Sequence, residues 1–153
     1  MKIGNIFVPV HPDFCYISSG FGLRNRNGVI EFHRGYDFAT YNKNIPVFSC
    51  FDGVVIVAGL SNSPGTGKRV FIQDKITRLY EFFCHLDEVL VLPNQKIIKG
   101  DVIGMTGNTG CESVGIHLHY ERRLIINDKN SSLELSPNLL QLFRSQPVHK
   151  APG

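Results

Sequence analysis

"GIHLHYERR", residues 115–123, places two histidines one residue apart in a run that alternates like a β-strand. The side chains of a strand point alternately to its two faces, so His117 and His119 share one face, with Cα atoms roughly 6.6 Å apart. Leu118 and Tyr120 then point the other way, into a core. Two imidazoles side by side on a strand predict a functional site on that face, and the rest of the chain must supply its other groups.

Further short apolar or alternating runs predict a mostly β chain. They lie at 29–32, 47–59, 68–74, 77–86 and 101–107, separated by turn sequences such as NRNG, DG and GNTG. Strands at about 8–12-residue spacing favour an antiparallel sheet, sandwich or barrel over alternating strands and helices. One short C-terminal helix is predicted at 136–146, because Ser136 can cap it, Pro137 suits its first turn and Phe143 completes an apolar stripe with two leucines.

The composition is that of one globular domain. The 153 residues are 42% hydrophobic and 19% charged, and the formal net charge of +3 is too small to indicate a nucleic-acid partner. No apolar run reaches the ~18 residues of a membrane helix, so we expect no membrane insertion. The N-terminus shows no secretory signal peptide, so we expect a protein made in the cytoplasm, or a secreted enzyme that lacks its leader. The four scattered cysteines are expected to be reduced, packed thiols.

Four of the six histidines fall at the ends of predicted strands or in adjoining loops: His33, His85, His117 and His119. Each alone is most simply a hydrogen-bonded strand residue, but the set exceeds what a β domain without a site needs. Two imidazoles and one carboxylate form a three-ligand set for catalytic Zn²⁺, which leaves the fourth position open for water. Two further imidazoles could carry protons or stabilise an oxyanion, because histidine titrates near neutrality.

The segment that joins His33 to Asp37 has a geometric requirement. Four fully extended residues span roughly 13 Å, which is too far for both side chains to share one metal ion. The chain must therefore bend between them, and Gly35 is the residue that would permit the bend.

The order of several short motifs resembles peptidase family M23, the zinc metallopeptidases of the LytM and lysostaphin type, which cut peptide bonds in bacterial peptidoglycan. These motifs are SSGFGLR (18–24), HRGYDFA (33–39), FCHL (83–86), IIKGDVIGMTGNTG (97–110), GIHLHYE (115–121) and SPNLL (136–140). The resemblance implies a LytM-like catalytic domain at 18–146, an N-terminal extension at 1–17 and a C-terminal tail at 147–153.

The resemblance also implies roles for single residues. One Zn²⁺ per chain would be held by His33, Asp37 and His119. His85 and His117 would be catalytic, facing the attacking water and the scissile carbonyl without binding the metal. Glu121 shares their strand face, where it would either orient an imidazole or face the solvent.

Three residues are candidates for lining the substrate cleft, with plain surface exposure as the alternative: Arg24, Arg34 and Tyr36. The chain departs from the family pattern at Phe83, where a tyrosine is usual, and in the longer loop that carries Cys111 and Glu112. Both departures bear on substrate preference rather than on metal binding.

Two other motifs do not hold. SPGTGKRV (63–70) lacks the first glycine of a phosphate-binding loop, where Asn62 stands, and Arg69 replaces its Ser or Thr, so we predict a hairpin turn. A Cys84–His85 catalytic pair is not expected, because adjacent strand residues point to opposite faces.

The implied function is a zinc-dependent endopeptidase that hydrolyses a cross-bridge or stem-peptide bond of peptidoglycan, and we expect a monomer. The alternative is a non-catalytic LytM-like module for wall binding or regulation. Such a module would lack several of the five key residues, all of which are present here. A cupin-like site is disfavoured, because it would need a further histidine downstream of Glu121, and the only histidine there is His149 in the tail. A phage lysin or virion-associated wall hydrolase fits a wall enzyme without a visible leader, as does a trimmed secreted enzyme.

Overall fold

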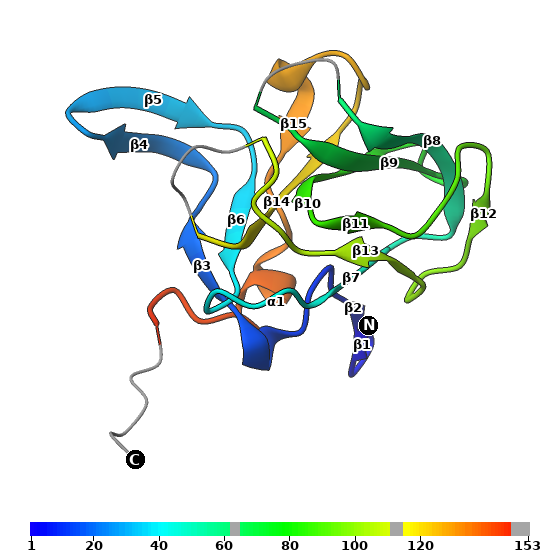
Figure 1. The fold of residues 1–153 in the computed structure, drawn as a ribbon, viewed down its shortest axis with the longest axis horizontal. Helices are drawn as coiled ribbons and strands as arrows, with labels where there is room; N and C mark the ends of the chain where they lie inside the picture. Colours follow the sequence, from blue (N-terminus) through cyan, green and yellow to red (C-terminus); the bar gives the residue numbers. More distant parts are fainter. Residues whose placement is uncertain (62–64, 111–114, 148–153) are drawn as a thin grey trace.

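The computed structural model describes residues 1–61, 65–110 and 115–147. Its main sheet is antiparallel, with the strand order β12-β8-β9-β10-β14-β6-β3 and with β15 paired to β14 outside this path (Figure 1). These strands are β3 (Tyr16–Ser19), β6 (Tyr36–Ala39), β8 (Gly53–Leu60), β9 (Lys68–Asp74), β10 (Tyr80–Leu86), β12 (Lys96–Ile97), β14 (His117–Arg123) and β15 (Ser132–Leu133). The predicted mostly β, antiparallel fold is confirmed.

Three smaller sheets surround the main one. They consist of β1 (Lys2–Ile3) with β2 (Ile6–Phe7), β4 (Gly22–Arg26) with β5 (Val29–His33), and β7 (Pro46–Phe48) and β11 (Glu88–Val89) on either side of β13 (Val102–Met105). The β4–β5 hairpin projects from the body of the molecule (Figure 1). Short 3₁₀ turns occupy Pro12–Phe14 and Lys129–Ser131.

The main sheet has one apolar face and one polar face where β10 and β14 pair. Phe83 and Tyr120 are opposite each other in the register, are fully buried and pack with ring centroids 5.1 Å apart in the main core. Cys84 and His119, the next pair, lie on the other face. The alternation predicted for β14 therefore holds, and it separates the core from the site.

Five predicted strand runs contain strands, but the run 47–59 is divided. Its first part belongs to β7, which pairs with β13, and its second part to β8, which pairs with β9. The hydroxyl of Ser49 donates to the carbonyl of Phe51 in the intervening turn. The strands β3, β4 and β6 were not predicted, because they are short and rich in Ser, Asn, Arg and Asp, which favour strands poorly.

The predicted helix at 136–146 is much shorter in the structure. Only α1 (Pro137–Leu140) is helical, with the Ser136 hydroxyl accepting from the Asn138 N–H and proline in the first turn, as predicted. Beyond it, the amides of Leu142 and Phe143 bond to carbonyls three residues back, and the Arg144 carbonyl accepts from Ile17 of β3. This bond to β3 turns the chain away from the helix axis, so the helical prediction is wrong after 140.

The segment predicted as an N-terminal extension packs into the same core as the rest of the chain. Val8, Val10 and Cys15 are fully buried and belong to the main core cluster. The described cysteines, Cys15, Cys50 and Cys84, are buried, as expected; Cys111 and Glu112 lie outside the described residues, as does most of the predicted tail.

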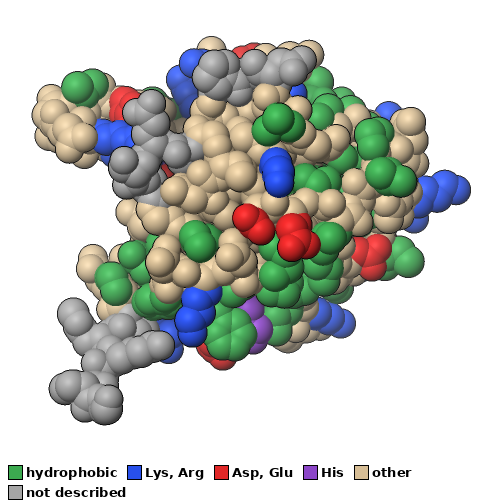
Figure 2. All heavy atoms as spheres, viewed as in Figure 1, with side chains coloured by type: hydrophobic (Ala, Val, Ile, Leu, Met, Phe, Trp, Pro, Cys, Tyr) green, Lys and Arg blue, Asp and Glu red, His purple; other side chains and the backbone are tan. Residues whose placement is uncertain are grey.

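Lysines and arginines lie among acidic and hydrophobic side chains on the face drawn in Figure 2. In the described residues, no helix is long and apolar enough to cross a membrane.

Candidate metal centre

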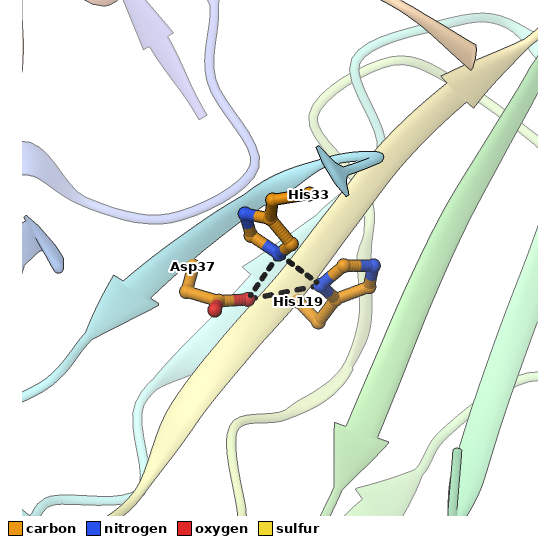
Figure 3. A group of neighbouring side chains, drawn as sticks. All are labelled: His33, Asp37 and His119. Atoms are coloured by element: carbon orange, nitrogen blue, oxygen red, sulfur yellow. Dashed lines mark hydrogen bonds and ion pairs between the residues drawn. The ribbon is translucent and has the colours of Figure 1, made fainter. Parts of the chain in front are cut away.

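Three side chains from three segments meet on the polar face of the sheet (Figure 3). His33 ends β5, Asp37 lies in β6, and His119 in β14 is opposite Asp37 in the register. His33 Nε2 lies 3.3 Å from His119 Nδ1 and 3.4 Å from Asp37 Oδ1, and His119 Nδ1 lies 2.9 Å from the same oxygen. These are the three residues that the sequence predicted as metal ligands.

The size of this triangle fits a zinc ion. Zn–N and Zn–O bonds of about 2.0–2.1 Å in a tetrahedron place neighbouring ligand atoms about 3.3 Å apart. The observed edges of 2.9, 3.3 and 3.4 Å are close to this value. Two imidazoles and one carboxylate are also the donor types of catalytic zinc sites, so the residues present fit the ion that the motif implies.

Hydrogen bonds on the outer side of each imidazole fix the tautomer that a metal requires. Nδ1 of His33 lies 2.9 Å from the Gly20 carbonyl, which only accepts, so this nitrogen carries the proton and donates it. Nε2 of His119 likewise donates to Glu121 Oε2 at 2.7 Å. In the neutral form of each ring, the lone pairs of His33 Nε2 and His119 Nδ1 would therefore both point into the triangle.

Glu121 is buried and binds the outer nitrogen of His119. Its Oε1 accepts from Arg123 Nε and from the Ser132 hydroxyl, both at 2.9 Å, while Oε2 accepts from His119. Of the two expectations for Glu121, the structure thus shows the one in which it orients an imidazole.

The carboxylates and imidazoles shift each other's pKa values. Burial opposes ionisation of Asp37, yet hydrogen bonds from His119 and His33 hold its pKa well below the usual range. Burial also opposes the charge of His119, but Asp37 and Glu121 raise its pKa to about 9. A metal ion that takes up Nδ1 of His119 therefore competes with a proton for that nitrogen.

Gly35 is required for close packing rather than for a special backbone conformation. The chain does bend between His33 and Asp37, as predicted, but Gly35 does not adopt a positive φ. A Cβ on it would lie 2.5 Å from the Tyr120 carbonyl oxygen and 2.7 Å from Cγ of Glu121. The absence of a side chain therefore lets the His33–Asp37 segment lie directly against β14.

We expect Gly35→Ala to weaken both the fold and the site. The methyl group would overlap a backbone oxygen that cannot rotate away, which should lower the free energy of unfolding by about 1–3 kcal/mol. Urea denaturation measures this change, with Gly20→Ala as the control, because a Cβ on Gly20 meets nothing within 4 Å. Equal unfolding midpoints for the two variants would contradict the close-packing role.

The other two predicted site histidines lie beside the triangle. The rings of His85 and His117 have centroids 4.9 Å apart, and both line the same cavity of about 540 Å³ as the three candidate ligands. Each donates from Nδ1 to a backbone carbonyl at 3.0 Å, His85 to Thr109 and His117 to Gly115. Nε2 is therefore the basic nitrogen of each ring. Burial, together with the charge of His117 nearby, lowers the pKa of His85 to about 4.

The prediction that Cys84 and His85 face opposite sides is wrong, because both line the cavity. The pairing of β10 with β9 is irregular between Phe83 and Leu86, and His85 has a positive φ of 65°. This bulge turns the His85 side chain to the same face as Cys84, which is buried, as predicted. Phe83 points into the core, so a tyrosine there would not bring its hydroxyl to this face.

Of the three predicted cleft residues, only Arg24 lines the cavity. Its guanidinium is bound to Glu31 at 2.8 Å and approaches Asp37 Oδ2 at 3.4 Å, so it supports a candidate ligand. The prediction for Tyr36 is wrong, because strand alternation turns it into the core, where its hydroxyl accepts from the Leu135 N–H. Arg34 lies 4.3 Å above the Phe32 ring and does not line this cavity.

Sequence reasoning missed Arg123 and Ser132, which hold the Glu121 carboxylate. Arg123 could have been found, because it follows Glu121 by two residues and so shares the strand face of both histidines. Ser132 could not, since it reaches the site only through the pairing of β15 with β14.

The model of "Peptidase family M23" matches residues 31–132. The chain belongs to this family. Peptidoglycan DD-endopeptidase ShyA of Vibrio cholerae is 40% identical over 108 residues, which cover 69% of this chain and 24% of ShyA. The M23 chain therefore spans about a quarter of the length of that relative.

Solved structures agree with the family assignment and with the predicted fold. The catalytic domain of lysostaphin from Staphylococcus simulans superimposes with a TM-score of 0.65 at 26% identity, covering 82% of this chain and 89% of that one. A zinc-containing peptidase from Vibrio cholerae gives 0.66 at 34% identity, covering 76% and 36%.

Proposed function

We propose that this M23 chain is a zinc-dependent endopeptidase that hydrolyses a peptide bond in bacterial peptidoglycan. The observation that carries the proposal is the convergence of two imidazole nitrogens and the Asp37 carboxylate in a triangle of zinc-ligand dimensions, beside two further imidazoles. Its relatives include a peptidoglycan DD-endopeptidase, lysostaphin and a zinc-containing peptidase.

One nitrogen of each imidazole donates a hydrogen bond to a neighbouring oxygen, and the position of the other nitrogen assigns the role of the residue. His33, Asp37 and His119 would hold the zinc, which, when bound, supplies Lewis-acid activation of water and of the scissile carbonyl. His85 and His117 would act through Nε2: one ring, unprotonated there, accepts the proton of the attacking water, and the other, in its doubly protonated form, donates a hydrogen bond to the developing oxyanion. The carbonyls of Thr109 and Gly115 hold both rings in the orientation for this.

The site of action is part of the proposal. A peptidoglycan endopeptidase must reach the cell wall, either delivered by a phage or after export from a bacterium. We propose that the chain acts there as a monomer.

The test is release of soluble muropeptides from purified peptidoglycan by the pure protein. We expect one zinc per chain, release that a chelator abolishes, and recovery when zinc is added back. Magnesium added back serves as the control, because Mg²⁺ prefers octahedral oxygen ligands to imidazole. Release that persists in excess chelator would contradict zinc dependence, and bound zinc without release from several wall types would indicate a non-catalytic module.

A further inference from the structure

The cavity extends past the histidines over an aromatic floor with an arginine at each end. Phe71 of β9 and Phe82 of β10 stack with centroids 3.8 Å apart and planes 15° from parallel. The Arg69 guanidinium lies 4.8 Å from the Phe71 ring centroid, and that of Arg123 lies 4.0 Å from the Phe82 centroid. This floor belongs to the same cavity as the candidate metal ligands.

Arg69 differs from the other arginines of the cavity, because it has no carboxylate partner among the described residues. Arg24 and Arg123 bind Glu31 and Glu121 at 2.8 and 2.9 Å, and Arg26 lies 3.7 Å from Glu31. For Arg69, the described part of the chain contains no ion pair.

Two buried polar atoms in the cavity wall also lack partners. They are Arg69 Nε and the Thr66 hydroxyl, the side-chain nitrogen and oxygen atoms that are buried without a hydrogen bond among the described residues. Both residues line the cavity. An unsatisfied buried donor costs free energy and is retained where a ligand supplies the missing acceptor.

The sheet register places Arg69 close to the candidate metal centre. His119 pairs with Cys84 of β10, and Arg69 lies opposite the bulge at 84–85, between the pairs Val70–Phe83 and Lys68–Leu86. Arg69 and His119 are therefore at the same level on the two strands that flank β10. Two strand spacings make this separation about 10 Å, the length of about three extended residues.

We propose that Arg69, with the Thr66 hydroxyl, forms a subsite that binds a free carboxylate of the substrate within three residues of the scissile bond. The proposal rests on the endopeptidase function and narrows its substrate to peptides that carry such a carboxylate, as stem-peptide cross-links do and an uninterrupted glycine bridge does not. A guanidinium binds a carboxylate through two parallel hydrogen bonds, and the stacked phenylalanines would cover the aliphatic part of the same residue.

The experiment compares two forms of one ligand. The probe is a muropeptide dimer with a direct stem-to-stem link, as the free acid and after amidation of its carboxylates. Binding is measured in the zinc-loaded His117→Ala protein, which would leave the probe uncut, and turnover in the protein with His117 intact. We expect the acid to bind about 10–100-fold more tightly than the amide, and Arg69→Gln to bind both equally. In turnover, Arg69→Gln should lower kcat/KM for the acid mainly by raising KM.

The controls separate charge at the subsite from charge in general. Lys75→Gln removes one positive charge beyond the far end of β9, where Lys75 is exposed and outside the cavity, and it should keep the full preference for the acid. Arg69→Lys should recover part of the preference, since it keeps the charge without the bidentate geometry.

The possible failures are distinguishable. Equal binding of acid and amide by the His117→Ala protein, or an Arg69→Gln protein that still prefers the acid, overturns the subsite. If the protein with His117 intact cleaves no wall but Arg69 still gives the acid its preference, the proposed endopeptidase function fails and the carboxylate subsite stands.

Discussion

His117→Ala is expected to abolish peptidoglycan cleavage while leaving zinc bound, whereas His119→Ala is expected to lose both. The two residues share one strand face, but only His119 presents a nitrogen to the triangle, at 2.9 Å from Asp37 Oδ1. His117 instead lies beside His85, and its Nδ1 donates to the Gly115 carbonyl. Loss of a general acid–base group lowers a rate by about 10²–10⁴-fold.

Zinc content by elemental analysis and muropeptide release measure the two effects separately. His11→Ala is the matched control, because this histidine packs against Phe14 near the N-terminus and lies outside the cavity. It should keep both zinc and activity. If His117→Ala loses the metal as readily as His119→Ala, the assignment of ligand and catalytic histidine is incorrect.

The shared strand face of His117 and His119 was predictable, because strand alternation is local. Side chains two residues apart share a face as long as the strand is regular, and the same rule extends to Glu121 and Arg123. Family motifs then implied which other residues would join them. In the structure, the pairing of β6 with β14 places Asp37 beside His119, and the bend after β5 adds His33.

The features that were not predicted depend on contacts between distant segments. The bulge that turns His85 toward the cavity comes from irregular pairing of β10 with β9 and from the bond of the His85 N–H to the Thr66 carbonyl. The early end of the C-terminal helix comes from the bond between Ile17 and Arg144. Neither leaves a periodic signal in its own segment.

Tyr36 shows a different kind of failure. The strand β6 is short and was not predicted, so its alternation could not be used to separate its two faces. Once the strand is recognised, Asp37 on the polar face places Tyr36 in the core. Residue type alone made the tyrosine a candidate for the cleft, whereas the strand register places it in the core.

Glu121→Gln is expected to weaken zinc binding by about 10–100-fold, the usual effect of losing a partner that orients a metal ligand. The carboxylate is buried and accepts three hydrogen bonds, from His119 Nε2, Arg123 Nε and the Ser132 hydroxyl. A glutamine has one accepting oxygen, so its amide group must point at a donor on one side. Either His119 loses the bond that fixes its tautomer, or Arg123 is left beside an N–H.

Competition with a chromogenic chelator measures the zinc affinity, and activity at saturating zinc separates affinity from catalysis. Because Glu121 acts through His119, we expect much of the activity to return when zinc is saturating, unlike in His117→Ala. Glu88→Gln, an exposed position on β11, is the matched control and should bind zinc like the parent protein. An unchanged zinc affinity in Glu121→Gln would mean that the Asp37 contact alone holds the His119 ring, and that the buried carboxylate contributes to the fold rather than to the metal.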